Sequence, residues 1–174
     1  MCILVISTSL NPKSRSRILA RHAHSALLPL DPSAAFVDLA LLNLPLCDGK
    51  AAYAHPEVGP LANQVQTAAA VILASPVYNY DASASAKNLI ELTGKAWTGK
   101  LVGLLSTAGG TGSYMAPMQL ANSLMLDFRC LIIPRFVFAL GAAFDGDRIS
   151  DPEIADRVQQ LAAETHRLAR LLLG

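Results

Sequence analysis

The sequence predicts an α/β fold in which a five-stranded parallel sheet carries helices on both of its faces. Five short apolar runs recur along the chain, and segments with the apolar spacing of a helix separate them. Runs that are apolar throughout are typical of strands buried on both faces, as in a parallel sheet. Right-handed crossovers between such strands restrict the arrangement further.

Length and composition favour one domain that spans residues 1–174. Apolar residues make up 52% of the chain and charged residues 16%, which allows a full core and argues against disorder. The formal net charge of +1 excludes a nucleic-acid-binding surface of the usual basic kind. No apolar stretch approaches the roughly 18 residues that span a bilayer. The three cysteines lack a CxxC spacing, so we expect free thiols, no structural metal and a cytoplasmic protein.

The first elements follow directly from local patterns. Residues 2–6 form an apolar run that predicts a central strand, and 35–38 predicts a short second strand. Ser14 is the expected N-cap of the helix between them, which ends at Pro29 and Pro32.

The middle of the chain is less regular. Residues 39–60 show little periodicity and predict a long connection, of a length that is often functional. A helix over 61–67 precedes the third strand, 71–74. Ser83 is the expected cap of the next helix, whose inner face comprises Ala86, Leu89, Ile90 and Thr93.

The last third predicts two more strands and two helices. The strands are 101–105 and 131–133, separated by a glycine-rich loop and a helix over 113–127. We expect the inner face of that helix to hold Met118, Ala121, Met125 and Phe128, which leaves Leu120 and Leu124 as surplus apolar surface. Asp151 and Pro152 begin the final helix. Its expected buried stripe is Ile154, Val158, Leu161, Thr165, Leu168 and Leu172.

The loop after the first strand has the composition of a phosphate site. Five hydroxyl side chains fall within ten residues: Ser7, Thr8, Ser9, Ser14 and Ser16. Four basic residues lie close by: Lys13, Arg15, Arg17 and Arg21. At a strand–helix junction, hydroxyls and free N–H groups hold an anion without a full buried ion pair. The alternative is that these serines only fill the loop and cap the helix.

Two further loops predict contacts to a flat ligand. After the third strand, Tyr78 is placed to pack on a ring and Asn79 to pair with a uracil-like edge; Tyr80 either covers the loop or contacts a partner subunit. After the fourth strand, residues 107–110 offer backbone N–H groups close to a ligand. The alternatives are a packed proline–tyrosine turn and a flexible turn. Together the three loops indicate one site with a phosphate end and a planar end, the shape of flavin mononucleotide (FMN).

These motifs resemble those of the NADPH-dependent FMN reductase family. Thr8 to Ser16 is similar to its first motif, with Asn11 in place of the usual Arg, for which Lys13, Arg15 and Arg17 are the available substitutes. The run 76–79 followed by Lys87-Asn88 is similar to its second motif, with Val77 where Glu is frequent and Tyr80 where Gly is typical; 106–110 is similar to the third. The expected cofactor-binding residues are Ser7, Ser9, Asn11, Ser14, Arg15, Ser16, Pro76, Val77, Tyr78, Asn79, Thr107, Gly109 and Gly110.

The resemblance implies a flavodoxin-like three-layer sandwich with strand order 2-1-3-4-5. It also implies bound FMN, NADPH or NADH as the electron donor, a small-molecule acceptor, and a homodimer or homotetramer. Hydride transfer at the flavin would follow ping-pong kinetics and requires no catalytic side chain. The alternatives are a flavodoxin-like electron carrier, which the net charge of +1 disfavours, and a binding module that has lost its flavin. No metal is expected, since the four histidines lack ligand spacing.

Overall fold

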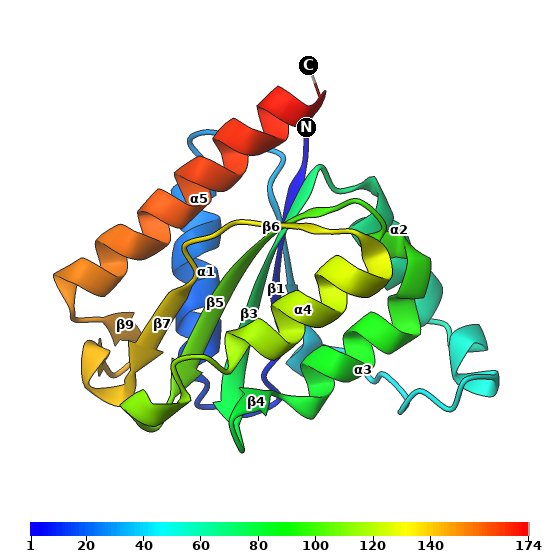
Figure 1. Ribbon diagram of the computed structural model, residues 1–174, viewed down its shortest axis with the longest axis horizontal. Helices are drawn as coiled ribbons and strands as arrows, with labels where there is room; N and C mark the ends of the chain where they lie inside the picture. Colours follow the sequence, from blue (N-terminus) through cyan, green and yellow to red (C-terminus); the bar gives the residue numbers. More distant parts are fainter. Residues whose placement is uncertain (174) are drawn as a thin grey trace.

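The computed structural model describes residues 1–173 and has a parallel sheet at its centre (Figure 1). The strand order is β2-β1-β3-β5-β6, which confirms the predicted flavodoxin-like order 2-1-3-4-5. These strands are β1 (Ile3–Ser7), β2 (Ala35–Asp38), β3 (Ala70–Tyr78), β5 (Leu101–Ala108) and β6 (Leu131–Ile132).

Helices cover both faces of the sheet, as predicted (Figure 1). One face carries α1 (Arg15–Leu27) and α5 (Pro152–Leu173), and the other carries α2 (Val58–Thr67), α3 (Ala84–Thr93) and α4 (Pro117–Phe128). Successive residues of β1 alternate between two cores: Ile3 packs in the α1–α5 core and Leu4 in the other. The sheet is therefore rigidly held from both sides.

Three helices begin with the predicted side-chain caps. The Ser14 Oγ accepts from the Arg17 N–H at 3.1 Å, and the Ser83 Oγ accepts from the Ala86 N–H at 3.3 Å. The Asp151 carboxylate accepts from the Glu153 N–H at 2.9 Å. These caps satisfy N–H groups that have no acceptor within their own helix.

Two strands extend further than the apolar runs indicate. The prediction placed the third strand at 71–74 and the fourth at 101–105, but β3 continues to Tyr78 and β5 to Ala108. In these extensions Pro76 is aligned with Thr107, and Val77 pairs with the short antiparallel strand β4 (Asp81–Ala82). Binding residues that were predicted to lie in loops therefore belong to the ends of these strands, and strand pairing fixes their positions.

The last strand is divided into two parts. β6 pairs with the beginning of β5, whereas β7 (Val137–Leu140) pairs with its end, and Pro134 lies between them. The prediction of one strand over 131–133 missed β7. Since proline has no N–H group for the ladder, the chain leaves the sheet there and rejoins it. A hairpin of β8 (Phe144–Asp145) and β9 (Arg148–Ile149) then leads to α5.

The connection between β2 and α2 contains two short 3-10 helices, η1 (Leu39–Leu41) and η2 (Ala51–Ala54). Helix α2 begins at Val58, three residues before the predicted start at Leu61. The Asn88 side chain on α3 holds this connection: it accepts from the Cys47 N–H at 2.8 Å and donates to the Pro45 carbonyl at 2.9 Å. Asn88 of the second motif therefore anchors residues 39–57 to the body of the protein.

The expected inner face of α4 was correct for Ala121, which is buried, and for Phe128, which packs against the core, but wrong for Met118 and Met125. The helix begins at Pro117, not Ser113, and it buries Leu120 and Leu124. Met118 and Met125 are instead 38% and 39% exposed. Both stripes are apolar, so the local sequence does not distinguish them. The structure of α5 is closer to its prediction. The predicted stripe is buried as far as Thr165, Leu168 is half-buried, and Leu172 is exposed near the end of the helix.

Within residues 1–173, no helix has the length and apolar character that crossing a membrane requires. Cys2, Cys47 and Cys130 are free thiols. Burial raises the pKa of Cys130 to about 11, and its sulfur donates to the Trp97 carbonyl. Cys130 is therefore a packed, unreactive side chain.

The position of α4 can be tested by truncating one buried and one exposed side chain. Leu124→Ala should lower the free energy of unfolding by about 3 kcal/mol, because it opens a cavity in the core. Asn122→Ala, its control on the exposed side of the helix, should change that free energy by less than about 0.5 kcal/mol. Urea unfolding followed by circular dichroism measures both. Equal losses would mean that the helix is rotated from the position described.

Candidate functional site

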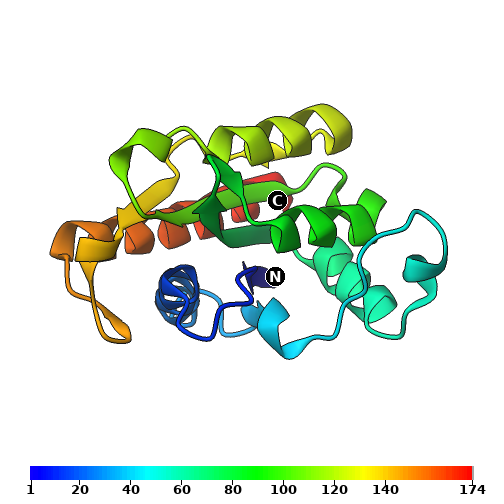
Figure 2. The same cartoon turned by 90° about the horizontal axis from the view of Figure 1, so that it is seen from below.

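Residues from all three predicted loops line one cavity at the carboxyl edge of the sheet, the edge that Figure 2 views. The cavity has a volume of about 220 Å³. Its walls come from three segments: Ser9, Asn11, Lys13, Ser14 and Arg15; Pro76, Val77 and Tyr78; and Thr107, Ala108 and Gly109. Because β1, β3 and β5 are neighbours and parallel, their ends meet here.

A second cavity of about 300 Å³ adjoins the first. Val77 lines both of them. The other walls are Asn79, Tyr80, Gly110, Gly112 and Ser113. Asn79 and Gly110, two of the predicted binding residues, therefore lie on the second cavity.

Ser7 and Ser16 are the two predicted binding residues that line neither cavity. Both side chains are fully buried. The Ser16 Oγ lies 3.0 Å from the Ser14 Oγ and supports it from behind. The Ser7 Oγ has no hydrogen-bond partner among the described residues, which marks an unsatisfied polar group beneath the loop.

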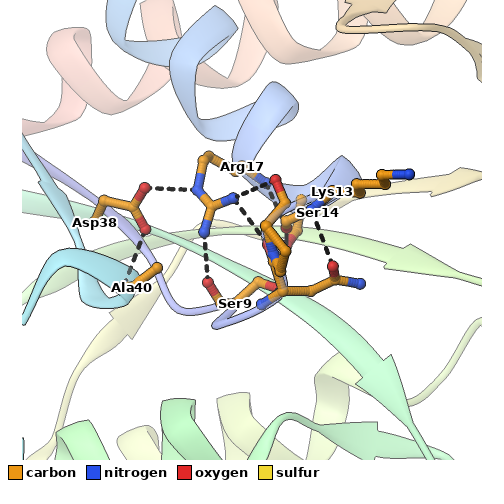
Figure 3. Close-up of polar contacts among 9 residues, drawn as sticks. Ser9, Lys13, Ser14, Arg17, Asp38 and Ala40 are labelled. Atoms are coloured by element: carbon orange, nitrogen blue, oxygen red, sulfur yellow. Dashed lines mark hydrogen bonds and ion pairs between the residues drawn. The ribbon is translucent and has the colours of Figure 1, made fainter.

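Arg17 holds the loop from behind (Figure 3). Its guanidinium donates to the Ser9 and Asn11 carbonyl oxygens, each at 2.9 Å. Its Nε lies 2.5 Å from the Asp38 Oδ2, and the side chains of this ion pair are only 11% and 5% exposed. Of the three predicted substitutes for the missing Arg at position 11, Arg17 is already paired with Asp38 and does not line the cavity, whereas Lys13 and Arg15 line it.

Asn11 shapes the loop through local hydrogen bonds. Its Oδ1 accepts from the Lys13 N–H at 2.9 Å, and its own N–H donates to the Ser9 Oγ at 3.3 Å. This turn leaves Lys13 and Arg15 as the cations that line the cavity. The Arg15 guanidinium lies against Gly141, where a Cβ would come within 2.7 Å of Nη1.

Buried hydroxyl groups connect the strand ends beneath the site. The Thr8 Oγ1 donates to the Ala74 carbonyl at 3.0 Å and lies 3.2 Å from the Ser83 Oγ. Ser75 accepts from the Ser83 N–H at 3.0 Å, and Ser85 donates to the Thr8 carbonyl at 2.5 Å. Ser83 was predicted as a helix cap, but this network was not predicted from the sequence. The only signal of this network in the sequence was the pair of small hydroxyl residues two positions apart, at 83 and 85.

Asn79 and Tyr80 form the tight turn between β3 and β4, with φ angles of +51° and +63°. Asparagine tolerates this left-handed region, but for tyrosine the conformation is uncommon. A Cβ at Gly112 would lie 3.3 Å from the Tyr80 Oη, so Tyr80 reaches over the glycine-rich segment. This contact fits the first predicted alternative, in which Tyr80 covers the loop, and contact with a partner subunit stays a prediction. Such strained turns are frequent at functional sites.

The chemistry of these walls fits a ligand with one anionic end and one flat, neutral end. At the first segment, the Ser9 and Ser14 hydroxyls and the N-terminus of α1 surround the space, and Lys13 and Arg15 add positive charge. At the other two segments the walls are an apolar strand end and a glycine-containing backbone. This donor set suits the phosphate and the ring of FMN.

A comparison with protein families gives an independent result. The sequence model of the NADPH-dependent FMN reductase family matches residues 1–145. That range includes every wall of both cavities. No curated protein sequence matches the chain.

Solved structures share the fold at low sequence identity. An NADH:FMN oxidoreductase (EMOB) in its apo form superposes with a TM-score of 0.82 at 17% identity, covering 96% of this chain and 89% of that chain. FerB, a flavoenzyme NAD(P)H:(acceptor) oxidoreductase from Paracoccus denitrificans, gives 0.78 at 21% identity, with 97% of each chain covered. A flavodoxin from the domain Archaea gives 0.70 at 12%, covering 98% and 99%. At these identities the likeness establishes the fold.

The buried ion pair behind the loop generates a prediction. Asp38→Asn leaves the Arg17 guanidinium buried without its counter-charge and should lower the free energy of unfolding by about 3 kcal/mol. Asp145→Asn removes the carboxylate of an exposed pair with Arg148 and should cost less than about 1 kcal/mol. Urea unfolding compares the two variants. A loss at Asp38 no larger than at Asp145 would contradict the role given to Arg17.

Proposed function

The chain belongs to the NADPH-dependent FMN reductase family, and from this premise we propose that it is an FMN-dependent NAD(P)H oxidoreductase that reduces a small acceptor. One observation carries the proposal: the loop after β1 and the carboxyl ends of β3 and β5 line a single cavity with a cationic and a neutral end. The proposed setting is the cytoplasm, where the three thiols stay reduced.

The phosphate of FMN would lie at the N-terminus of α1. The first N–H groups of the helix, of Arg15 and Ser16, have no acceptor within the helix and point toward this end. The Ser9 and Ser14 hydroxyls add neutral donors, and Lys13 and Arg15 balance the charge from the solvent side. Binding here needs no fully buried ion pair, so little desolvation is required.

The flavin ring would lie between the two other segments. Tyr78 and Val77 would provide an apolar wall, and the backbone beyond the end of β5, at Gly109 and Gly110, would provide N–H groups. Such donors stabilise negative charge that develops at the ring edge on reduction. We assign no acid or base to a side chain, because hydride chemistry requires only position and electrostatics.

When bound, FMN supplies hydride acceptance from NADPH or NADH and passes the electrons to flavin, quinone or another small acceptor. The protein contributes the space in which donor and acceptor meet the ring. The second cavity, with Asn79 and Tyr80 on one side and Gly112 on the other, opens beside the proposed ring position. Because one opening would serve both substrates, we propose that they bind in turn, by a ping-pong mechanism.

We also propose a homo-oligomer, with the outer face of α4 as the contact between subunits. Met118, Met125 and Leu126 are 38%, 39% and 74% exposed on this helix. Tyr114 and Met115, just before it, are 46% and 61% exposed. A continuous apolar surface of this kind commonly marks an interface.

The proposed activity has a direct test. The purified protein, supplied with FMN, should show flavin absorbance that NADPH or NADH bleaches within seconds in the absence of oxygen. The absorbance should return when a quinone is added. Lys13→Ala should weaken FMN binding about tenfold, as expected for one charge-assisted phosphate contact. Lys95→Ala, an exposed lysine far from the cavity walls, is the control.

Two outcomes would overturn the proposal in different ways. A protein that binds FMN but is not reduced by either coenzyme would be an electron carrier. A protein that gains no flavin on reconstitution would be a binding module. Flavin fluorescence and stopped-flow absorbance distinguish them.

The proposed interface can be tested by measuring the mass of the oligomer. The double variant Met118→Glu, Met125→Glu should dissociate the oligomer, because two buried charges per subunit cannot be paired across it. Leu172→Glu, on the exposed end of α5, should leave the mass unchanged. Sedimentation equilibrium measures the mass. A monomeric parent protein would contradict the proposal.

A further inference from the structure

A third cavity continues from the phosphate end of the site. It has a volume of about 880 Å³ and shares Lys13, Ser14 and Arg15 with the first cavity. It crosses the N-terminal half of α1, from η1 to the β8–β9 hairpin, which packs beside α1 (Figure 2). We call this cavity the outer groove. The proposed FMN uses only the first two cavities, so the outer groove has no role in the function proposed above.

The charge of the outer groove is positive. Lys13, Arg15 and Arg21 line it, and none of the three forms an ion pair with a carboxylate in residues 1–173. The fourth basic residue on its wall, Arg17, is neutralised by Asp38. The remaining carboxylate is that of Asp147, at the turn of the hairpin. The groove therefore favours an anion near α1 and a hydroxyl-bearing group near Asp147.

The walls between these charges are apolar. Leu10 and Leu41 line the groove and are 61% and 81% exposed, so their apolar side chains are accessible to a ligand. Phe144 and Ile18 face the same space and are half-buried. Exposed apolar walls beside cations suit a flat aromatic base that carries a phosphate.

The position of the groove indicates which ligand this is. FAD consists of FMN joined through its phosphate to adenosine monophosphate (AMP). The outer groove begins at the residues that would hold the FMN phosphate, whereas a nicotinamide coenzyme would enter at the opposite, ring end. We propose that the outer groove binds the AMP half of FAD, so that the protein accepts FAD as well as FMN. This inference rests on the proposed flavin site.

In this arrangement the residues that line the outer groove contact different parts of the AMP half. Arg21 and Arg15 contact the second phosphate, Asp147 accepts hydrogen bonds from the ribose hydroxyls, and Phe144 and Leu41 cover the adenine. Arg21 is held in place by the Phe36 ring, 6.0 Å from its guanidinium carbon. Arg21 does not line the cavity proposed for FMN. Its substitution should therefore affect binding of the AMP half of FAD without affecting binding of FMN.

The test compares the affinities of FMN and FAD for the flavin-free protein by flavin fluorescence and calorimetry. FAD should bind at least as tightly as FMN. Arg21→Ala should weaken FAD about tenfold and leave FMN within twofold, and Arg21→Lys should recover part of the loss. Arg170→Ala removes one charge from an exposed position on α5 and should change neither affinity. Unchanged FMN binding shows that each variant is folded.

Several outcomes would overturn the inference. FAD that binds tenfold or more weakly than FMN would show that the AMP half is not accommodated. Equal loss of FMN and FAD affinity in Arg21→Ala would place Arg21 in the common site. If the FMN-loaded protein binds 2′,5′-ADP and Arg21→Ala abolishes that binding, the groove belongs to the electron donor. Failure of FMN itself to bind would instead refute the proposed function.

Discussion

A buried chain of hydroxyl groups ties together two of the three segments that form the site, those at the ends of β1 and β3. Thr8 follows β1, Ser75 lies on β3, and Ser83 caps α3, yet the Ser83 side chain contacts those of both Thr8 and Ser75. Parallel strands alone align the ends of β1 and β3 along the sheet. The hydroxyl chain adds fixed positions for the residues beyond those ends, because each bond is buried and costly to leave unmade. The cavity walls are thereby set before any ligand binds.

The loop after β1 separates two electrostatic tasks. Arg17 and Asp38 form their ion pair behind the loop, where the guanidinium also binds loop carbonyl groups. The front of the loop keeps hydroxyls and helix N–H groups free to face an anion. A positive charge close to the loop thus serves to fix its shape. The charges that face the ligand, on Lys13 and Arg15, stay near solvent, where they are less costly to maintain.

The charge and polarity of the surface therefore change along the carboxyl edge of the sheet. Its ring end is neutral and made of strand ends, the Asn79–Tyr80 turn and glycine backbone. Its middle holds the N-terminus of α1, and its outer end carries three unpaired cations with exposed leucines. A neutral, then anion-binding, then mixed surface matches the order of groups along a flavin nucleotide. The proposed activity and the proposed FAD binding both follow from this order.

Much of this organisation was encoded in local sequence. Apolar runs, the caps Ser14, Ser83 and Asp151, and three polar segments at strand ends indicated the fold class and the segments that meet at one edge, whereas the strand order followed from the family resemblance. Burial on both faces and helix capping depend on residues a few positions apart, so single stretches reveal them.

Only the tertiary structure decided features that depend on distant partners. Helix α4 had two apolar stripes, and the core selected Leu124 over Met125. β3 extends to Tyr78 because β4 and β5 pair with it. Arg17 turned from a candidate ligand contact into a support because Asp38, at the end of β2, lies beside it. Such features depend on packing and strand pairing between residues that are distant in the sequence. The local sequence pattern does not specify which distant residue makes each contact.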